Sequence, residues 1–350
     1  MADLPFHPMI GNLIALLQLT GTCLIGRGIL KLFREEFHWL LALAAGMVVI
    51  SQLGYLMILI QDGLWLLEVT AWGMLVAGML VVLRFFTKSG IRVRWTLPNG
   101  WEEWLVVLLS GAFLILALGP PTQADALDYH WGVPVYLMRH GHWPATNIWL
   151  HGSLAGIGEV YIFLGLLLHA ENLSTLLQAF GLVGFAYFIS RNLPYEKSVF
   201  LKLFILACPV LLFFMTGPKP QLFPQVITAL ALWLTLRDDQ LTPSRYLLIV
   251  LLLCGASQQK LSFVLTGGVV GLWASYKILG RHPFALLLAG LLMLAFFAPR
   301  SWWNWQQVSE PGMLTLLTPL PDSFTQFLKD FREQQLWFPF NLVVPESLRF

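Results

Sequence analysis

The stretch Gly119–Ser153, GPPTQADALDYHWGVPVYLMRHGHWPATNIWLHGS, is the longest interruption between strongly apolar segments before the C-terminal tail. It holds two carboxylates, four of the eight histidines and one arginine, and aromatic residues alternate with these ionisable ones. This mixture is typical of a segment that lies in a membrane–water interface and directs its polar groups toward a specific place. The stretch therefore predicts a membrane protein with a functional loop between two sets of apolar helices.

The composition excludes a soluble globular domain. The chain is 57% hydrophobic and only 11% charged, with a mean hydropathy of +0.70, whereas about a quarter of the residues are charged in soluble domains. We therefore predict an all-α polytopic membrane protein. The net charge of +2 is too small to indicate a nucleic-acid partner. The three cysteines lie far apart in apolar segments, which argues against a disulfide framework or a metal site but leaves a tertiary pair open.

A bilayer crossing needs roughly 17–25 apolar residues, and about ten segments come close to that length. Two further stretches, around Val133–His140 and Leu154–His169, are predicted to be helices that lie in the interface or re-enter the membrane without crossing it. The predicted spans are Met9–Gly26, Phe37–Ile60, Gly63–Phe86, Trp104–Gly119, Leu173–Ser190, Ser198–Met215, Leu222–Leu236, Tyr246–Ala256, Leu261–Tyr276 and Phe284–Ala298.

The distribution of Lys and Arg sets the predicted orientation, because cytoplasmic loops carry an excess of basic residues. With the N-terminus outside and Leu154–His169 not crossing, thirteen of the twenty-one basic residues fall in cytoplasmic loops. If Leu154–His169 crossed, every later loop would be inverted and its basic residues would face outward. We therefore expect the central loop and the tail after Arg300 on the extracytoplasmic side.

Three regions follow from this pattern. Residues 1–100 are predicted to form an N-terminal element of three membrane helices, whose first helix is retained because it has no basic n-region and no cleavage site. Residues 101–320 form a membrane core that includes the outer loop 119–153. Residues 321–350 form an outer tail, in which Asp322–Gln335 has the spacing of an amphipathic helix.

Charged and polar side chains, which are unfavourable next to lipid, gather on the predicted outer side. Charged side chains next to lipid cost a few kcal/mol, so their convergence indicates one polar pocket. A carboxylate in such a pocket can act as a general base, and Lys219, Lys260 and Arg300 can hold a phosphate. The candidate site residues are Asp125, Asp128, Tyr129, His130, Arg139, Glu159, Lys219, Lys260, Arg300 and Asn304.

Structural roles remain open for several of these residues. Asp125 can be a helix cap or a solvated loop acid, and Asp128 can form an ion pair with Arg139. Lys219 and Arg300 can extend to lipid headgroups, as basic residues near helix ends commonly do. Glu159 is expected in the pocket, because the alternative is an unpaired carboxylate against lipid.

Zinc binding by the histidines of the loop is a further interpretation. His140, His142 and His151 are close in the sequence, but their spacing matches no recognised set of zinc ligands.

Several motifs, in order along the chain, resemble those of the GT-C glycosyltransferases, the membrane enzymes that include protein O-mannosyltransferases and aminoarabinose transferases. The motifs are ADALDYHW at 124–131, RHGHWP at 139–144, TGPKPQLFP at 216–224, GASQQKLSF at 255–263 and APRSWWNWQQVSEPG at 298–312. The resemblance covers Trp104–Pro319. It implies a GT-C-like helical bundle with interfacial helices in the large outer loop.

The resemblance also implies an activity. It is the transfer of a sugar, with inversion, from a polyprenyl-phosphate donor to an acceptor hydroxyl on the extracytoplasmic side of a bacterial inner membrane. Asp125 would be the base, with Asp128 nearby, and Lys260 would contact the donor phosphate. A divalent cation, Mg²⁺ or Mn²⁺, stays open as a cofactor, and the acceptor is a glycan, lipid or protein.

Two other classes of function are compatible with the same residues. One is a transporter or flippase of an amphipathic anionic substrate, for which repeats with broken helices in matching positions are expected. The other is a non-catalytic membrane subunit of the same fold.

Overall fold

The computed structural model describes residues 8–60, 63–87, 98, 100–119, 126–144, 155–215 and 217–306. The described residues form helices joined by short connections and contain no strand. The chain separates into two compact units: the first is Met1–Trp143 with Ala155–Phe297, and the second is Pro144–Leu154 with Ala298–Phe350.

Helices occupy all ten segments that the apolar pattern predicted as spans. Three shorter helices lie in the region between α4 and α7: the π-helical turn η1 (Ala126–His130), α5 (Gly132–His140) and α6 (Ile157–Leu166). The longer helices are α1 (Pro8–Leu32), α2 (Trp39–Leu59), α3 (Leu64–Thr87), α4 (Trp101–Leu116), α7 (Leu173–Ser190), the pair α8 (Tyr195–Leu206) and α9 (Pro209–Met215), α10 (Leu222–Arg237), α11 (Pro243–Gln259), α12 (Phe263–Ile278) and α13 (Pro283–Gln306).

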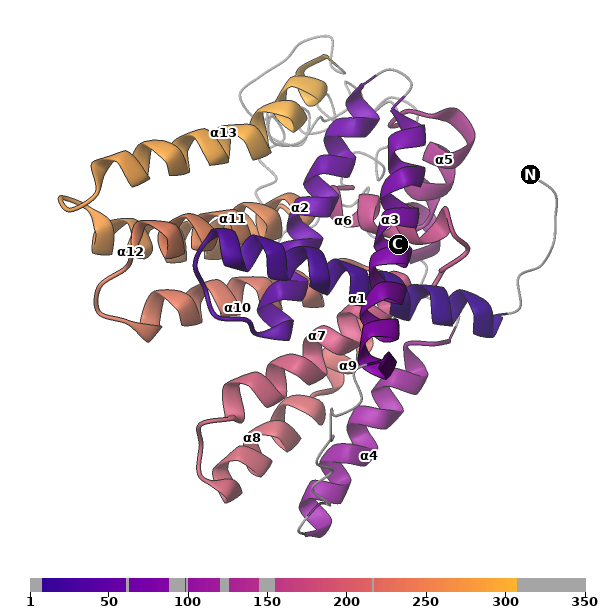
Figure 1. Ribbon diagram of the computed structural model, residues 1–350, viewed down its shortest axis with the longest axis vertical. Helices are drawn as coiled ribbons and strands as arrows, with labels where there is room; N and C mark the ends of the chain where they lie inside the picture. Colours follow the sequence, from indigo (N-terminus) through magenta and orange to yellow (C-terminus); the bar gives the residue numbers. More distant parts are fainter. Residues whose placement is uncertain are drawn as a thin grey trace, which may run out of the picture. The chain divides into compact units, whose positions relative to one another are not determined.

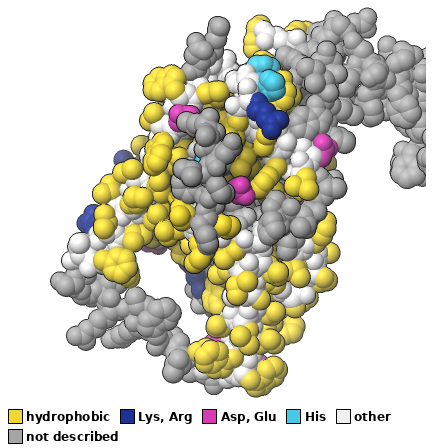
Figure 2. Space-filling model, turned by 90° about the vertical axis from the view of Figure 1, so that its right-hand side faces the viewer, with side chains coloured by type: hydrophobic (Ala, Val, Ile, Leu, Met, Phe, Trp, Pro, Cys, Tyr) yellow, Lys and Arg dark blue, Asp and Glu magenta, His cyan; other side chains and the backbone are white. Residues whose placement is uncertain are grey.

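The helices identify the chain as an integral membrane protein, as predicted, although they do not confirm the number of spans. Among the described residues, five helices are long and apolar enough to cross a membrane, namely α1, α2, α3, α7 and α13. α4, α10 and α12 have 16 residues each, which is about 24 Å of helix against a hydrocarbon core of about 30 Å. Length alone therefore does not identify them as spans. Figure 2 shows one face on which most described side chains are hydrophobic.

A bend of 60° separates α8 from α9, and the pair counts as a sixth candidate span if it is taken as one broken helix. The break falls at Ala207 and Cys208, directly before Pro209. A proline inside a continuous helix removes a backbone hydrogen bond and clashes with the preceding turn, so the helix restarts at Pro209 instead of continuing.

Glycines allow α1 to pack directly on the backbones of α2 and α3. A Cβ atom at Gly26 of α1 would overlap the carbonyl oxygen of Ala42, and one at Gly46 of α2 would overlap that of Thr22. At the crossing with α3, a Cβ atom at Gly21 would overlap the carbonyl oxygen of Met74. Small residues drive such close helix contacts in membranes, where lipid supplies no hydrophobic force between helices.

Charged groups gather at one end of the first unit, which we call the basic end. Glu35, in the turn between α1 and α2, accepts a hydrogen bond from Arg245 Nε at 2.5 Å and lies 3.8 Å from Arg237. Arg245 also pairs with Asp238. Lys277 Nζ donates to the carbonyl oxygens of Thr235 at 2.7 Å and Asp238 at 2.9 Å. The turns α1/α2, α10/α11 and α12/α13, all predicted to be cytoplasmic, therefore lie together.

The opposite end of the first unit joins the end of α4 to the start of α7. Asn172 Nδ2 donates to the carbonyl oxygen of Leu118 at 2.9 Å, and Thr175 Oγ1 donates to that of Ala117 at 2.7 Å. The segment between α4 and α7 thus begins and ends at the same end of the bundle. In Figure 1, α10, α11 and α12 run side by side from the basic end toward this end.

All ten residues of α6 are buried inside the first unit. Of the two predicted alternatives, an interfacial or a re-entrant helix, this burial disagrees with the interfacial one. The carbonyl oxygen of Leu164 accepts a hydrogen bond from Gln18 of α1 at 3.1 Å, and the Tyr161 hydroxyl lies 2.9 Å from that of Thr22. The reason is visible in its sequence, IGEVYIFLGL, which is apolar on every face. Such a helix is stable when it is surrounded by protein and not when one side faces water.

Candidate functional site

The first turn of α6 holds a buried carboxylate. Glu159 is 1% exposed, and its Oε2 accepts a hydrogen bond of 2.6 Å from the backbone N–H of Gly156. The other oxygen, Oε1, lies 2.5 Å from His130 Nδ1. A buried carboxylate is tolerated when it is paired in this way. Glu159, predicted as a pocket residue, thus has His130 as its polar partner.

His130 is positioned by an unusual turn. It is the last residue of η1, a π-helical turn closed by a 2.8 Å hydrogen bond from Trp131 N to the carbonyl oxygen of Ala126. π-helical turns are rare and occur often at functional sites. This turn directs His130 into the protein, where it is 2% exposed, and leaves Asp128 on the surface. The Tyr129 ring lies 4.0 Å from the imidazole between ring centroids.

The second nitrogen of His130 is available for chemistry. Nε2 is buried and has no hydrogen-bond partner among the described residues. If Nδ1 carries the proton and donates it to Glu159, Nε2 has a free lone pair that can accept a proton or a hydrogen bond. Buried polar atoms are almost always paired, so this nitrogen is an exception among the described residues.

Two turns from the second half of the chain lie against the start of α6. Gly158 has no side chain, and a Cβ atom there would lie 2.6 Å from Pro220 Cβ and 3.7 Å from Gln259 Cγ. Pro220 belongs to the turn before α10, which also holds Lys219, and Gln259 ends α11 directly before Lys260. Both lysines are half-buried. Three of the predicted site segments therefore meet at one point.

The turn with Lys219 is held by α7. Ser174 Oγ donates to the carbonyl oxygen of Pro218 at 2.9 Å, and the backbone N–H of Phe223 donates to Gln178 Oε1 at 2.7 Å. Both polar side chains are buried. They fix the backbone on each side of Lys219, so the position of this turn relative to α6 is defined.

Gln259 is a further buried polar residue at this point, and the sequence reasoning did not select it. Its side chain is 2% exposed, and neither its Oε1 nor its Nε2 has a hydrogen-bond partner among the described residues. A buried amide can donate two hydrogen bonds and accept others. Its position in the polar sequence SQQK, at the end of an apolar helix, was the available signal. We call His130, Glu159 and Gln259, with the adjacent Lys219 and Lys260, the polar cluster.

The structure does not bring every predicted site residue into the polar cluster. Arg139 is exposed on α5. Arg300 and Asn304 are buried, and they belong to the second unit. Asp125 lies outside the described residues, as do His151 and the predicted amphipathic segment Asp322–Gln335.

In the described ranges, no three His, Cys, Asp or Glu side chains are placed to hold a metal ion. The rings of His140 and His142 are neighbours, with centroids 6.2 Å apart, and the Tyr136 ring packs against both. We therefore assign no chemical step to a metal.

Comparison with known proteins places the chain in a family. Residues 98–350 match the model of the DUF1420 N-terminal domain. The chain belongs to the DUF1420 family. The part that matches the DUF1420 domain begins just before α4 and contains the whole polar cluster, whereas α1, α2 and α3 precede it. No curated protein and no solved structure matches the chain.

Proposed function

We propose that this protein is a membrane-embedded transferase of the GT-C type. It moves a sugar from a polyprenyl-phosphate donor to an acceptor hydroxyl on the extracytoplasmic side, with inversion at the anomeric carbon. The observation that carries the proposal is the polar cluster. A buried histidine, oriented by a carboxylate, lies in the same cluster as two turns that each bear a lysine.

The orientation in the membrane is part of the proposal. The turns that gather at the basic end are cytoplasmic, and the polar cluster lies at the opposite end of α10 and α11, which is extracytoplasmic. In this arrangement all ten longer helices, with α8 and α9 as one broken span, cross the membrane. The short helices α10 and α11 do so with most of their residues buried in the protein, where 16 or 17 residues are enough.

The chemistry needs a group that accepts a proton and groups that stabilise a phosphate. The acceptor hydroxyl loses its proton as its oxygen attacks the anomeric carbon, and the bond from that carbon to the donor phosphate breaks. Asp125 is the proposed base. Lys219 and Lys260 are the proposed cations that stabilise the departing phosphate, because fixed charges act strongly where water is excluded.

His130 and Glu159 have a supporting role in this proposal. Glu159 holds the imidazole so that Nε2 faces the substrate, the same arrangement by which carboxylates orient histidines in many active sites. Nε2 binds the acceptor hydroxyl and places it for attack. The amide of Gln259 supplies further hydrogen bonds to the sugar.

The test is a transfer assay with purified full-length protein in detergent or nanodiscs. The probe is a polyprenyl-phosphate sugar labelled in the sugar, and the readout is release of free polyprenyl phosphate. Asp125→Asn should abolish release, and Lys260→Met should reduce it by roughly 100-fold or more, the usual effect of removing one transition-state contact. Glu171→Gln, an exposed acid next to α7, is the matched control and should retain full activity. Full activity of Asp125→Asn in a folded protein would remove the assignment of the base.

One observation favours a transporter or flippase as the second candidate. The 60° break between α8 and α9 is the kind of discontinuity found in transporter helices. Reconstitution in vesicles with a fluorescent polyprenyl-phosphate lipid in one leaflet separates the two functions. Movement of the label between leaflets without release of the sugar would favour the transporter.

A further inference from the structure

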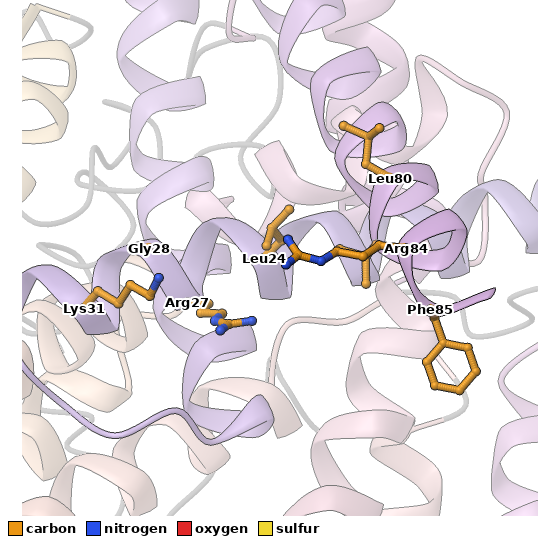
Figure 3. A pocket seen from close by; sticks show the side chains of 8 residues that line it. Leu24, Arg27, Gly28, Lys31, Leu80, Arg84 and Phe85 are labelled. Atoms are coloured by element: carbon orange, nitrogen blue, oxygen red, sulfur yellow. The ribbon is translucent and has the colours of Figure 1, made fainter. Parts of the chain in front are cut away.

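A second site lies far from the polar cluster, in a groove between α1 and α3 at the basic end. The two helices touch backbone to backbone where Gly21 meets Met74 and Gly78 meets Leu17. Beyond this crossing both helices continue toward their C-terminal ends, and the groove lies in the angle between them (Figure 3). Its volume is about 770 Å³, a size typical of ligand sites.

Three cations line this groove, Arg27 and Lys31 of α1 and Arg84 of α3. Residues four apart on a helix lie on the same face, so Arg27 and Lys31 are neighbours. In Figure 3 the guanidinium of Arg84 extends from α3 toward α1 beside Leu24. The three positive charges therefore surround one space, which favours an anion.

These cations differ from Arg237 and Arg245 at the basic end. Arg237 and Arg245 are neutralised by Glu35, Glu36 and Asp238. No ion pair joins Arg27, Lys31 or Arg84 to an acid within the described part of the chain, and the Arg27 guanidinium lies 5.3 Å from the centroid of the Phe37 ring. Three like charges on one cleft repel each other, so a bound anion would remove an unfavourable term.

The rest of the lining is apolar, and the apolar and basic residues occupy different positions along the two helices. Leu24 and Leu80 lie nearer the helix crossing, and the cations lie nearer the C-terminal ends of the two helices. Both leucines are exposed, at 37% and 59%. Gly28 lies between Leu24 and Lys31 in the lining, and nothing is within 4 Å of the place where its Cβ atom would be. A ligand with an anionic head and a hydrocarbon chain matches this gradient.

We propose that the groove binds one anionic phospholipid of the cytoplasmic leaflet. Its phosphate lies among Arg27, Lys31 and Arg84, its glycerol region occupies the space left by Gly28, and an acyl chain lies on Leu24 and Leu80. Basic pockets between membrane helices on the cytoplasmic side are suited to such headgroups. The site is independent of the proposed transfer reaction.

The test measures lipid binding to purified full-length protein by native mass spectrometry. The probes are phosphatidylglycerol and phosphatidylcholine with identical acyl chains, and inorganic phosphate as a competitor. Wild-type protein should retain phosphatidylglycerol in preference to phosphatidylcholine, and phosphate should not displace it. The variant with Arg27→Gln, Lys31→Gln and Arg84→Gln should bind phosphatidylglycerol on the order of 100-fold more weakly, at roughly 5-fold for each basic charge removed near a membrane.

Two matched controls distinguish lipid binding in the groove from non-specific binding to surface charge. Lys197→Gln, Lys202→Gln and Arg281→Gln together remove the same charge elsewhere and should leave binding unchanged. Gly28→Leu keeps every charge but fills the groove, and it should also abolish preferential binding. Gly73→Leu, at an equally open position of α3 outside the groove, should not.

Three results would overturn the proposal. One is equal loss of binding in the two charge variants, and another is wild-type binding by Gly28→Leu. Displacement of the lipid by inorganic phosphate would show an anion site without lipid selectivity.

Discussion

The imidazole of His130 and the carboxylate of Glu159 are 29 residues apart in the sequence and 2.5 Å apart in space, from Nδ1 to Oε1. Both side chains are almost completely buried. Removing one member of such a pair leaves the other desolvated and unpaired, which typically costs about 3–5 kcal/mol. Glu159→Ala should therefore lower the unfolding temperature of the purified protein in detergent. The exposed Glu171→Ala should leave it unchanged.

A double-mutant cycle tests whether the two side chains act as a pair. Glu159→Ala, His130→Ala and the double variant should show a coupling free energy of at least about 1 kcal/mol, as contacting residues in one network do. Additive effects of the two single substitutions would contradict the pairing.

The contact between Gly158 and Pro220 predicts a second effect. Gly158→Val would force its side chain into Pro220, and overpacking of this kind costs about 1–3 kcal/mol. We expect lower thermal stability and weaker transfer activity, because the turn with Lys219 would move away from α6. Gly111→Val, in an open position on α4, is the control. Unchanged stability of Gly158→Val would show that the turn does not pack on α6.

The glycine contacts of α1 predict that small residues are required there. Gly21→Leu should prevent α3 from packing on α1, because its side chain would occupy the position of the Met74 backbone. A backbone cannot yield as a flexible side chain can, so we expect a loss of more than about 3 kcal/mol or no folded protein. The measurement is the monodisperse yield by size-exclusion chromatography, compared with that of Gly73→Leu. A wild-type yield of Gly21→Leu would contradict the crossing.

His38, which caps α2, predicts a pH dependence. Burial, and secondarily the nearby Arg191, lower its pKa from 6.5 to about 4. The unfolded chain therefore binds a proton near pH 6.5, whereas the folded chain stays neutral until about pH 4. The contribution of neutral His38 to the free energy of unfolding is therefore fully present above pH 6.5, and it is lost as the pH falls from 6.5 toward 4.

The measurement is the unfolding temperature of wild type and His38→Gln from about pH 8 to about pH 4. The wild type should lose more stability on acidification than the variant does. Nδ1 of His38 accepts the N–H of Leu40 at 3.3 Å, so protonation also weakens the cap. Parallel curves for the two proteins would contradict the prediction.

Much of the fold was predictable from the sequence, because lipid imposes a simple rule on helix composition. Apolar length located all ten longer helices, and the basic residues indicated which turns lie together. The pairing of Glu35 with Arg237 and Arg245, from turns far apart in the sequence, agrees with that grouping. The lengths of the apolar segments did not predict the break at Pro209. They also did not show that α6 is completely buried, because apolar residues favour lipid and protein interior equally.

The candidate site was predictable in part. The cost of a charge in an apolar helix identified Glu159, and the same reasoning singled out Lys219 and Lys260. The partner of Glu159 was not identified, since the loop offers four histidines and sequence distance does not choose among them. Gln259 was missed because a neutral amide at the end of an apolar helix does not stand out in the sequence as a charged residue does. Its side-chain oxygen and nitrogen are found to lack partners only when the neighbouring described residues are known.

The enclosure of α6 by α2, α7 and α11 has a consequence for biogenesis. The ribosome completes α6 about a hundred residues before it reaches the end of α11, which at roughly 5–20 residues per second is a delay of several seconds or more. During that time α6 has no complete protein environment, so it must wait in the translocon or at the bilayer surface. The polar cluster can therefore be assembled only after its last helix has been synthesised, and nascent chains truncated before α11 should be recognised by membrane quality-control proteases.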